Sequence, residues 1–305
     1  MSRSLIAIRH MEPEQIRELI DLAVKLKDDV LHDRKISAGK RRTIGLLFFE
    51  NSTRTRVSFE QACNYLDYRI VNFGGSGSSM NKGESLKDTI LTLKHERLEA
   101  VVMRHRSSGS AQLGQGYFGG ALINAGDGQH EHPTQALGDA LTILERKGRL
   151  DGLKIAIVGD VMHSRVARSN AWLLSKMGSE VRFVGPRTLM PSSMGMLPGE
   201  VHYDLRQGIS GADIVMCLRL QKERMTDGRL SSIGEFRRLY QVNRATLKWA
   251  KEDAIVMHPG PMNRGVEVDD MTADGPKSVI SEQVENGVFV RTAVLKWIFD
   301  GEGVN

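Results

Sequence analysis

The chain has 305 residues, which is long for one hydrophobic core and sufficient for two domains of about 150 residues each. Charged residues make up 26% and hydrophobic residues 40%, as in soluble globular proteins, and the apolar runs are too short to span a bilayer. The 42 Lys and Arg exceed the 37 Asp and Glu by a formal charge of +5, but the only basic cluster, residues 40–42, has no aromatic residue within it. We therefore expect no membrane and no nucleic acid as a partner, although a modest positive excess suits small anionic substrates.

Two features indicate the compartment. Residues 1–15 contain neither a long apolar stretch nor a small-residue cleavage site, so we expect no secretory signal. Cys63 and Cys217 fall inside apolar helix and strand patterns, where reduced core thiols are usual. We therefore expect a cytoplasmic protein.

The first half of the chain alternates short apolar runs with helical patterns. Pro13 opens a helix with an apolar stripe from Ile16 to Leu26. Four β-like runs follow, each too short and too rich in β-formers for a helix. These predicted strands are Thr43–Phe49, Arg69–Phe73, Ala100–Arg104 and Ala121–Ala125.

A predicted helix from Pro133 to Lys147 leads to a second series of the same kind. Its strands are expected at Lys154–Val158, Val181–Val184, Asp213–Cys217 and Ala254–Met257. Strand–helix alternation predicts parallel sheets with helices on both faces. The expected fold is α/β, with two doubly wound parallel-sheet domains joined by inter-domain helices. We expect domains at residues 1–134 and 135–286, with a final helix at 287–305 packing back on the first.

The sequence "FFENSTRTRVSFEQA" places polar residues between the first strand and a helix. Ser52 and Thr53 lie where the first amide N–H groups of that helix lack partners. A cap explains one hydroxyl, but not a run of polar side chains that includes Arg54 and Arg56. Helix amides, hydroxyls and guanidinium groups together predict a site for a phosphate or carboxylate.

The other polar motifs also follow predicted strands, where ligands of open α/β sheets bind. Arg165 and Arg219 follow strands of the second domain and, facing one cleft, would suit carboxylates, although most arginines are ordinary surface charges. The loop "HPGP" is either a simple turn or a source of backbone carbonyls for a ligand N–H. Lys82, in the Gly/Ser-rich stretch "SSMNKGES", is either a solvated charge or a functional one.

A metal site is the main alternative chemistry. His130 and His132, in the motif that also carries Asp127, could ligate zinc, with Asp160, His163 or His258 from other motifs as further ligands. However, neither an HExxH helix nor a CxxC pair occurs. "IAIVGDVMHSR" opens like a dinucleotide-binding turn but lacks GxGxxG. We expect no metal and no cofactor, and a direct attack between two bound substrates.

Seven motifs occur in order from position 52 to 265: "STRTR", "KGES", "MRH", "GDGxxxHPTQ", "HSRVARS", "LRLQKER" and "HPGPMNRG". Over essentially the whole chain, this set closely resembles the catalytic chains of the aspartate carbamoyltransferase family. Members transfer the carbamoyl group of carbamoyl phosphate to L-aspartate in pyrimidine biosynthesis. Ornithine carbamoyltransferases are the related enzymes to exclude, and they carry His-Cys-Leu-Pro in place of "HPGP" and Ser-Met-Gly in place of "LRLQ".

The resemblance implies a role for each motif residue. Residues that would hold the phosphate are Ser52, Thr53, Arg54, Thr55 and Arg104. Residues that would donate to the carbonyl oxygen are Thr55, Arg104 and His132. Groups that would hold the carbamoyl NH2 are Gln135 and the carbonyls of Gly260 and Pro261, with a cis peptide bond between the last two. Residues that would bind the aspartate carboxylates are Arg165, Arg219 and Gln221.

The resemblance also implies a homotrimer whose active sites are shared, because Ser78 and Lys82 reach the site from the neighbouring subunit in such enzymes. It leaves open a regulatory chain or a dihydroorotase as a further partner. Three alternatives remain: a carbamoyltransferase for ornithine, a metal-dependent hydrolase using the His/Asp cluster, and a nucleic-acid binder using the basic charge.

Overall fold

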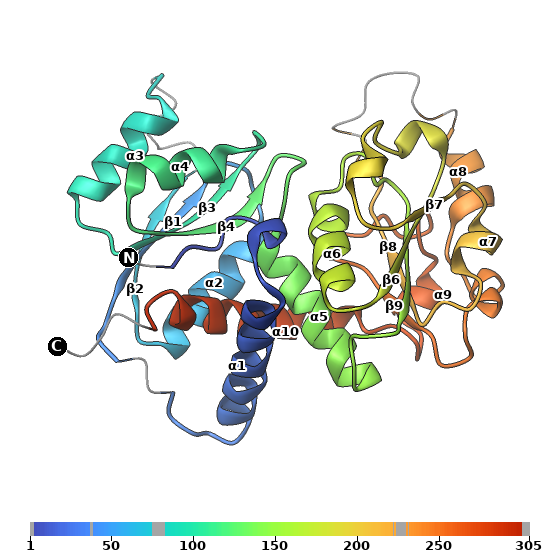
Figure 1. Ribbon diagram of the computed structural model, residues 1–305, viewed down its shortest axis with the longest axis horizontal. Helices are drawn as coiled ribbons and strands as arrows, with labels where there is room; N and C mark the ends of the chain where they lie inside the picture. Colours follow the sequence, from blue (N-terminus) through green and yellow to red (C-terminus); the bar gives the residue numbers. More distant parts are fainter. Residues whose placement is uncertain are drawn as a thin grey trace. The chain divides into compact units, whose positions relative to one another are not determined.

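The computed structural model describes residues 3–36, 39–74, 83–221, 223, 230 and 232–300. The chain folds as two compact units, and Figure 1 colours it by position in the sequence. Unit 1 comprises Met1–Leu141 and Glu285–Asn305, and unit 2 comprises Thr142–Val284. The chain thus passes from one unit to the other inside α5 (Pro133–Lys147) and returns inside α10 (Ile280–Trp297). These crossings lie a few residues from the expected domain bounds. Both fall inside continuous helices, where the sequence shows no break that would mark a boundary.

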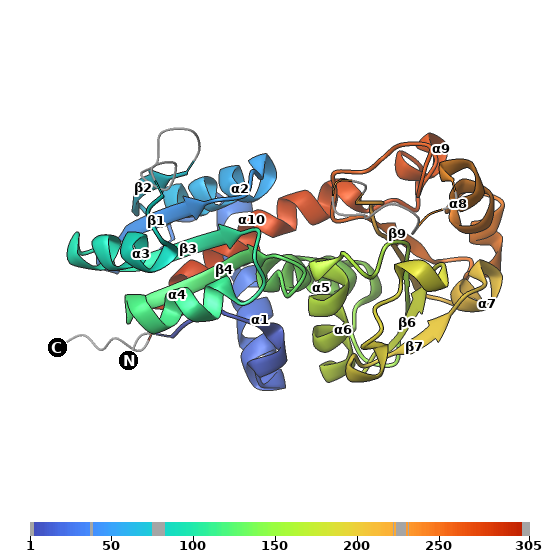
Figure 2. The ribbon, with the colours of Figure 1, turned by 90° about the horizontal axis from the view of Figure 1, so that it is seen from above.

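Unit 1 contains a four-stranded parallel sheet in the order β2-β1-β3-β4. Figure 2 shows β1, β3 and β4 side by side. The strands are β1 (Thr43–Phe48), β2 (Arg69–Phe73), β3 (Ala100–His105) and β4 (Ala121–Asp127). Its other helices are η1 (Ile8–His10), α1 (Pro13–Leu31), α2 (Thr53–Tyr65), α3 (Leu86–His95) and α4 (Ser110–Phe118).

Helices cover both faces of this sheet because most of each central strand is apolar, at residues 44–48 of β1 and 100–103 of β3. Figure 1 shows α3 and α4 on one face and α2 and α10 on the other. On the first face Ile90 of α3 and Phe118 of α4 pack with Leu47, Val101 and other buried strand residues. Two buried faces explain the unbroken apolar runs of the central strands.

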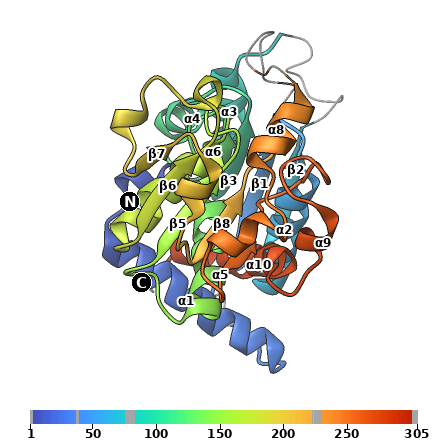
Figure 3. The same ribbon diagram turned by 90° about the vertical axis from the view of Figure 1, so that its right-hand side faces the viewer.

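Unit 2 contains a five-stranded parallel sheet in the order β7-β6-β5-β8-β9. Figure 3, which faces this unit, shows β6, β5 and β8 side by side. The strands are β5 (Lys154–Val158), β6 (Glu180–Val184), β7 (Glu200–His202), β8 (Ile214–Cys217) and β9 (Ile255–Met257). The helices are α6 (Arg165–Lys176), η3 (Arg187–Leu189), η4 (Met194–Met196), α7 (Leu205–Ile209), α8 (Ile233–Tyr240), η6 (Thr246–Trp249) and α9 (Asp270–Ala273).

One face of the unit 2 sheet is covered by α7 and α8, whose residues Ile209 and Phe236 pack with Ala156, Val215 and Val256 of the strands. Figure 1 shows α6 on the opposite face. The expectation of two parallel-sheet α/β domains is therefore confirmed. The sequence reading missed β7, an edge strand of three residues with no fully buried side chain.

Each unit holds one cysteine in its interior. Cys63 lies on α2 in unit 1, and burial raises the pKa of its thiol to about 12. Cys217 ends β8 in unit 2, and burial likewise raises the pKa of its thiol. Among the described residues, no helix is both long enough and apolar enough to cross a bilayer.

Candidate active site

Three loops of unit 1 meet at the carboxyl edge of its sheet, because β1, β3 and β4 are neighbours and all run in the same direction. Phe48, the last residue of β1, lies opposite Arg104 of β3 in the register. The amide of Phe49 donates to the Arg104 carbonyl at 2.9 Å. Arg104 is thereby placed beside the polar loop that precedes α2.

The start of α2 has the geometry expected of an anion site. Ser52 is the N-cap residue, but its hydroxyl makes no capping hydrogen bond to the helix amides. It donates instead to Oγ1 of the buried Thr55, at 3.0 Å. Thr53 and Arg54, the first two helical residues, are exposed. The amides at this helix start are therefore not occupied by the cap hydroxyl and suit an incoming anion.

Arg104 is held rigidly in place. Its Nη2 donates to Oε1 of Glu50 at 2.7 Å, and its Nη1 donates to the carbonyl of Ala125 at 3.2 Å. The side chain is largely buried, so losing Glu50 would leave a buried charge without its partner. Glu50 orients the guanidinium and partly offsets its charge, a role that the sequence reading did not assign.

The third loop brings His132 and Gln135 to the start of α5. His132 is buried, and its carbonyl accepts from the Gln135 amide at 3.0 Å. The Gln135 side chain donates from Nε2 to Oδ1 of Asp139, one helical turn later, at 2.9 Å. His132 and Gln135 thus lie at the same sheet edge as Arg104.

Asp127, considered as a metal ligand above, is already satisfied within this loop. Its carboxylate accepts from Asn124 Nδ2 at 2.8 Å and from the Gly109 amide at 2.8 Å. His130 Nδ1 lies 3.1 Å from the same carboxylate. Among the described residues no group of three or more His, Cys, Asp or Glu side chains is placed to hold a metal ion. The loop is a hydrogen-bonded support for His132.

Unit 2 repeats this organisation at the carboxyl edge of β5, β8 and β9. The buried carboxylate of Asp160 lies 2.8 Å from His163 Nδ1 and accepts from the backbone N–H of Gln221 at 3.2 Å. Gln221 Nε2 donates to the His163 carbonyl at 2.9 Å. These bonds tie the loop after β5 to the loop after β8. Arg165, the first residue of α6, follows directly and is buried.

Arg219 already binds a carboxylate in this structure. Its Nη1 donates to Oε2 of Glu223 at 3.1 Å, and its Nη2 contacts the other carboxylate oxygen. This fork-to-fork geometry is the one that guanidinium groups favour for carboxylates. The Arg219 side chain is partly exposed and can therefore offer the same fork to a ligand.

The loop after β9 contains a cis peptide bond between Gly260 and Pro261, which confirms that expectation. The Gly260 amide donates to Nδ1 of His258 at 2.8 Å, so the ring proton lies on Nε2, which faces Oε1 of Glu267 at 3.1 Å. That oxygen also accepts from the Asn263 amide at 2.5 Å. Asn263 Nδ2 donates to the Leu220 carbonyl at 3.2 Å, next to Arg219. The loops after β8 and β9 are therefore held together.

Replacing Glu267 should show how much this buried network stabilises unit 2. Glu267→Ala leaves the His258 ring and the Asn263 amide without their acceptor. We expect the free energy of unfolding to fall by about 2–4 kcal/mol. Glu282→Ala, which breaks an exposed pair with Arg146, serves as the control and should cost no more than about 1 kcal/mol. Urea unfolding compares the two; equal losses would contradict a structural role for the network.

Two predicted site residues, Ser78 and Lys82, lie outside the described residues. The sequence reading in turn missed four supporting side chains: Glu50, Asp139, Asn263 and Glu267. Glu50 had a local signal, since it directly follows a buried strand. Asp139 had another, its spacing of four residues from Gln135 on a predicted helix.

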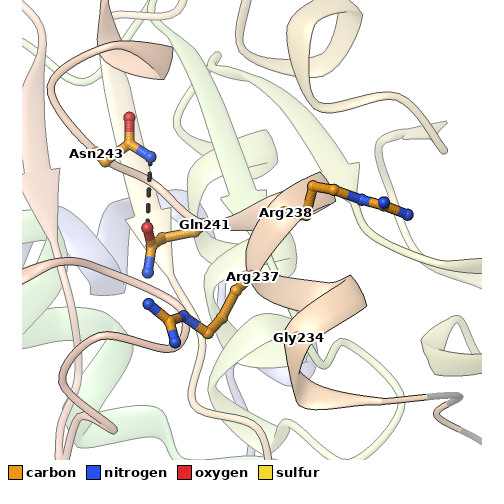
Figure 4. A pocket seen from close by; sticks show the side chains of 5 residues that line it. All are labelled: Gly234, Arg237, Arg238, Gln241 and Asn243. Atoms are coloured by element: carbon orange, nitrogen blue, oxygen red, sulfur yellow. Dashed lines mark hydrogen bonds between the residues drawn. The ribbon is translucent and has the colours of Figure 1, made fainter.

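A shallow pocket at the end of α8 contains none of the predicted site residues. It is lined by Gly234, Arg237, Arg238, Gln241 and Asn243. Figure 4 shows Arg237 near Gln241 and Arg238 directed away from both. Gln241 Nε2 donates to the Gly265 carbonyl at 2.7 Å, and its Oε1 accepts from Asn243 at 3.4 Å. The amides here support a turn, and both arginines are exposed.

Comparison with known proteins identifies the class of protein that this fold and these sheet edges define. Residues 3–145 match the aspartate/ornithine carbamoyltransferase carbamoyl-P binding domain, and residues 151–298 match the Asp/Orn binding domain of the same family. The chain belongs to the aspartate/ornithine carbamoyltransferase family.

Individual relatives agree with this assignment. The chain is 48% identical to the aspartate carbamoyltransferase catalytic subunit of Desulforamulus reducens, over 98% of this chain and 96% of that protein. A structure of aspartate transcarbamoylase from Trypanosoma cruzi with carbamoyl phosphate and aspartate has a TM-score of 0.87 at 32% identity, covering 97% and 96% of the two chains. Ornithine carbamoyltransferase from Pyrococcus furiosus has a TM-score of 0.88 at 27% identity, covering 98% of each chain.

Proposed function

We propose that this protein is an aspartate carbamoyltransferase, which transfers the carbamoyl group of carbamoyl phosphate to L-aspartate and yields N-carbamoyl-L-aspartate and phosphate. The observation that carries the choice of acceptor is the Arg219 fork, which binds a carboxylate at the carboxyl edge of unit 2. Arg165 adds a second cation at that edge. Two guanidinium groups suit the two carboxylates of aspartate, whereas they would repel the side-chain ammonium of ornithine.

The start of α2 binds the phosphate. Helix amides, the hydroxyls of Ser52 and Thr53, and the Arg54 guanidinium supply donors and positive charge, and Arg104 adds a further cation. Thr55, Arg104 and His132 donate to the carbonyl oxygen of the substrate. Negative charge grows on that oxygen as the tetrahedral intermediate forms, so donors fixed in advance lower the barrier. The pairing of Arg104 with Glu50 supports this role, because a held guanidinium needs no reorganisation during the reaction.

The carbamoyl NH2 is recognised by acceptors. These are the Gln135 side-chain oxygen and the carbonyls of Gly260 and Pro261. The neutral amine of aspartate attacks the carbonyl carbon, forming a C–N bond as the bond from carbon to the phosphate oxygen breaks. The departing phosphate takes the proton that the amine loses. Arg165, Arg219 and Gln221 hold the aspartate carboxylates, so that the protein contributes orientation and charge stabilisation.

The protein acts in de novo pyrimidine biosynthesis, works in the cytoplasm and assembles as a homotrimer with active sites shared between subunits. Ser78 and Lys82 of one subunit complete the site of its neighbour. The charge of the substrates supports the contribution of Lys82, because carbamoyl phosphate and aspartate together carry about four negative charges into one site. Extra cations lower the electrostatic cost of binding both.

Product formation from the two candidate acceptors tests the function. Purified protein with carbamoyl phosphate should form carbamoyl-aspartate from aspartate and no citrulline from ornithine. Activity should persist in EDTA, because no step needs a divalent cation. Preference for ornithine would overturn the proposed acceptor, and loss of turnover on chelation would favour a metal-dependent hydrolase.

A further inference from the structure

A buried carboxylate and a buried guanidinium lie beneath the predicted carbamoyl site, and no step above uses either of them. Asp139 on α5 has 0% of its surface exposed, and Arg291 on α10 has 5%. Both belong to unit 1, as does Gln135. Burying charged groups is costly, and replacing buried opposite charges by apolar residues is often neutral or stabilising. These two buried charges therefore call for an explanation beyond stability.

Asp139 determines which way the Gln135 amide faces. A glutamine side chain has a donor NH2 and an acceptor oxygen of nearly the same shape, so a flip exchanges their places. An ionised carboxylate only accepts hydrogen bonds, and Asp139 Oδ1 accepts from Gln135 Nε2 at 2.9 Å. The alternative orientation would set two acceptors against each other. With Nε2 committed to Asp139, the Gln135 oxygen remains for a ligand that donates.

Arg291 provides a nearby positive charge that attracts the Asp139 carboxylate. Its Nη1 donates to the Gly287 carbonyl at 2.8 Å, and the guanidinium lies 5.5 Å from the Phe59 ring centroid. Burial lowers the pKa of Arg291 to about 10, against a rise caused by the nearby Asp139, so the group stays cationic at neutral pH.

Small residues make room for this arrangement where α5 and α10 cross. A Cβ added at Gly287 would come within 2.5 Å of Arg291 Nη1, and one added at Gly138 would contact the Gly287 backbone at 3.5 Å. Gly287 thus leaves the space that the guanidinium occupies. The site under Gln135 is built from both helices.

We propose that Asp139, supported by Arg291, is a positioning residue that fixes the Gln135 amide with its oxygen towards the substrate and so selects a carbamoyl group over acyl groups without an N–H. This inference rests on the proposed function and deepens it. An acetyl phosphate has the same phosphate and a similar shape, but it carries a methyl group where carbamoyl phosphate carries NH2. The ratio of the binding constants of carbamoyl phosphate and acetyl phosphate therefore reports the orientation of the Gln135 amide.

Asp139→Asn tests the proposal with minimal change of shape. An asparagine NH2 group facing Gln135 donates to the glutamine oxygen, so the Gln135 amide turns its NH2 group, rather than its oxygen, towards the substrate. We expect the KM for carbamoyl phosphate to rise about tenfold, the effect of one hydrogen bond, while the inhibition constant of acetyl phosphate changes less than about twofold. A merely structural defect would weaken both ligands alike. Asp253→Asn, at an exposed partner of Lys147, is the matched control and should change neither constant.

A double-mutant cycle separates this inference from the proposed function. Gln135→Ala should abolish most of the preference for carbamoyl over acetyl phosphate, and adding Asp139→Asn should then have no further effect on it. If Gln135→Ala keeps the preference, the assigned role of Gln135 is wrong and the inference fails with it. If Gln135→Ala loses the preference while Asp139→Asn keeps it, the proposed function stands and the positioning role is overturned.

A second variant covers the case in which Asp139→Asn leaves the buried Arg291 without a nearby negative charge and prevents folding. Asp139→Asn combined with Arg291→Gln removes both buried charges, so neither is left without an opposite charge nearby. Far-ultraviolet circular dichroism checks its fold. This folded variant should show the same tenfold loss for carbamoyl phosphate alone, and an unchanged ratio of the two constants would overturn the proposal.

Discussion

Arg54→Ala and Lys82→Ala proteins are each expected to lose at least about a hundredfold in kcat, the scale seen when a transition-state donor is removed. Unfolded together and reassembled, they should regain activity. In a trimer with shared sites, about a quarter of the sites in an equal mixture would pair an intact Arg54 with an intact Lys82. Activity measured before and after reassembly, with the trimers isolated by size, checks the result.

The control for this experiment is each variant taken through the same procedure alone, which should remain inactive. Arg54 lies at the start of α2, where its loss removes charge without disturbing a buried core. If mixed trimers form and stay as inactive as their parents, the two residues do not act in one shared site. The proposal of a homotrimer with shared active sites would then lose its support.

Arg219→Lys should raise the KM for aspartate by about 10- to 100-fold, since lysine cannot reproduce the two parallel hydrogen bonds of the guanidinium fork. The KM for carbamoyl phosphate should stay nearly unchanged, because the phosphate donors belong to unit 1. The same substitution also loses the fork to Glu223, which orients Arg219 in this structure. Steady-state kinetics with each substrate varied in turn measures both constants.

A matched substitution guards against a general effect of replacing arginine by lysine in unit 2. Arg237→Lys lies on the exposed surface of α8 and should leave both KM values as they are. A similar rise for both substrates in Arg219→Lys would mean that this arginine supports the fold. It would also remove the main argument for aspartate as the acceptor.

The fold was predictable from sequence because its strongest signals are local. Apolar runs of a few residues alternate with helical periodicity, and the helix Pro133–Lys147 has the observed bounds of α5. The missed β7 shows the limit of such patterns. It is a three-residue edge strand, and its placement depends on hydrogen bonds to β6 rather than on an apolar pattern of its own.

The candidate site was predictable in outline for a different reason. Parallel strands place their carboxyl ends at one edge, so residues that follow β1, β3 and β4 in sequence meet in space. The pairing of Arg104 with Glu50, however, joins residues 54 positions apart and follows only from the strand register. For Asp139 the spacing of four residues from Gln135 was visible, but its burial depends on how α5 packs and does not follow from that spacing.

The position of the two cysteines has a practical consequence. With one thiol buried in each unit, an alkylating reagent can modify Cys63 only when unit 1 opens and Cys217 only when unit 2 opens. Mass spectrometry of the two tryptic peptides would then follow the opening of each unit separately, in the unaltered protein and without an engineered probe. The alkylation rate of Cys63 thus reports how often unit 1 opens, and that of Cys217 how often unit 2 opens. Adding substrate and measuring both rates would show how far it protects each unit.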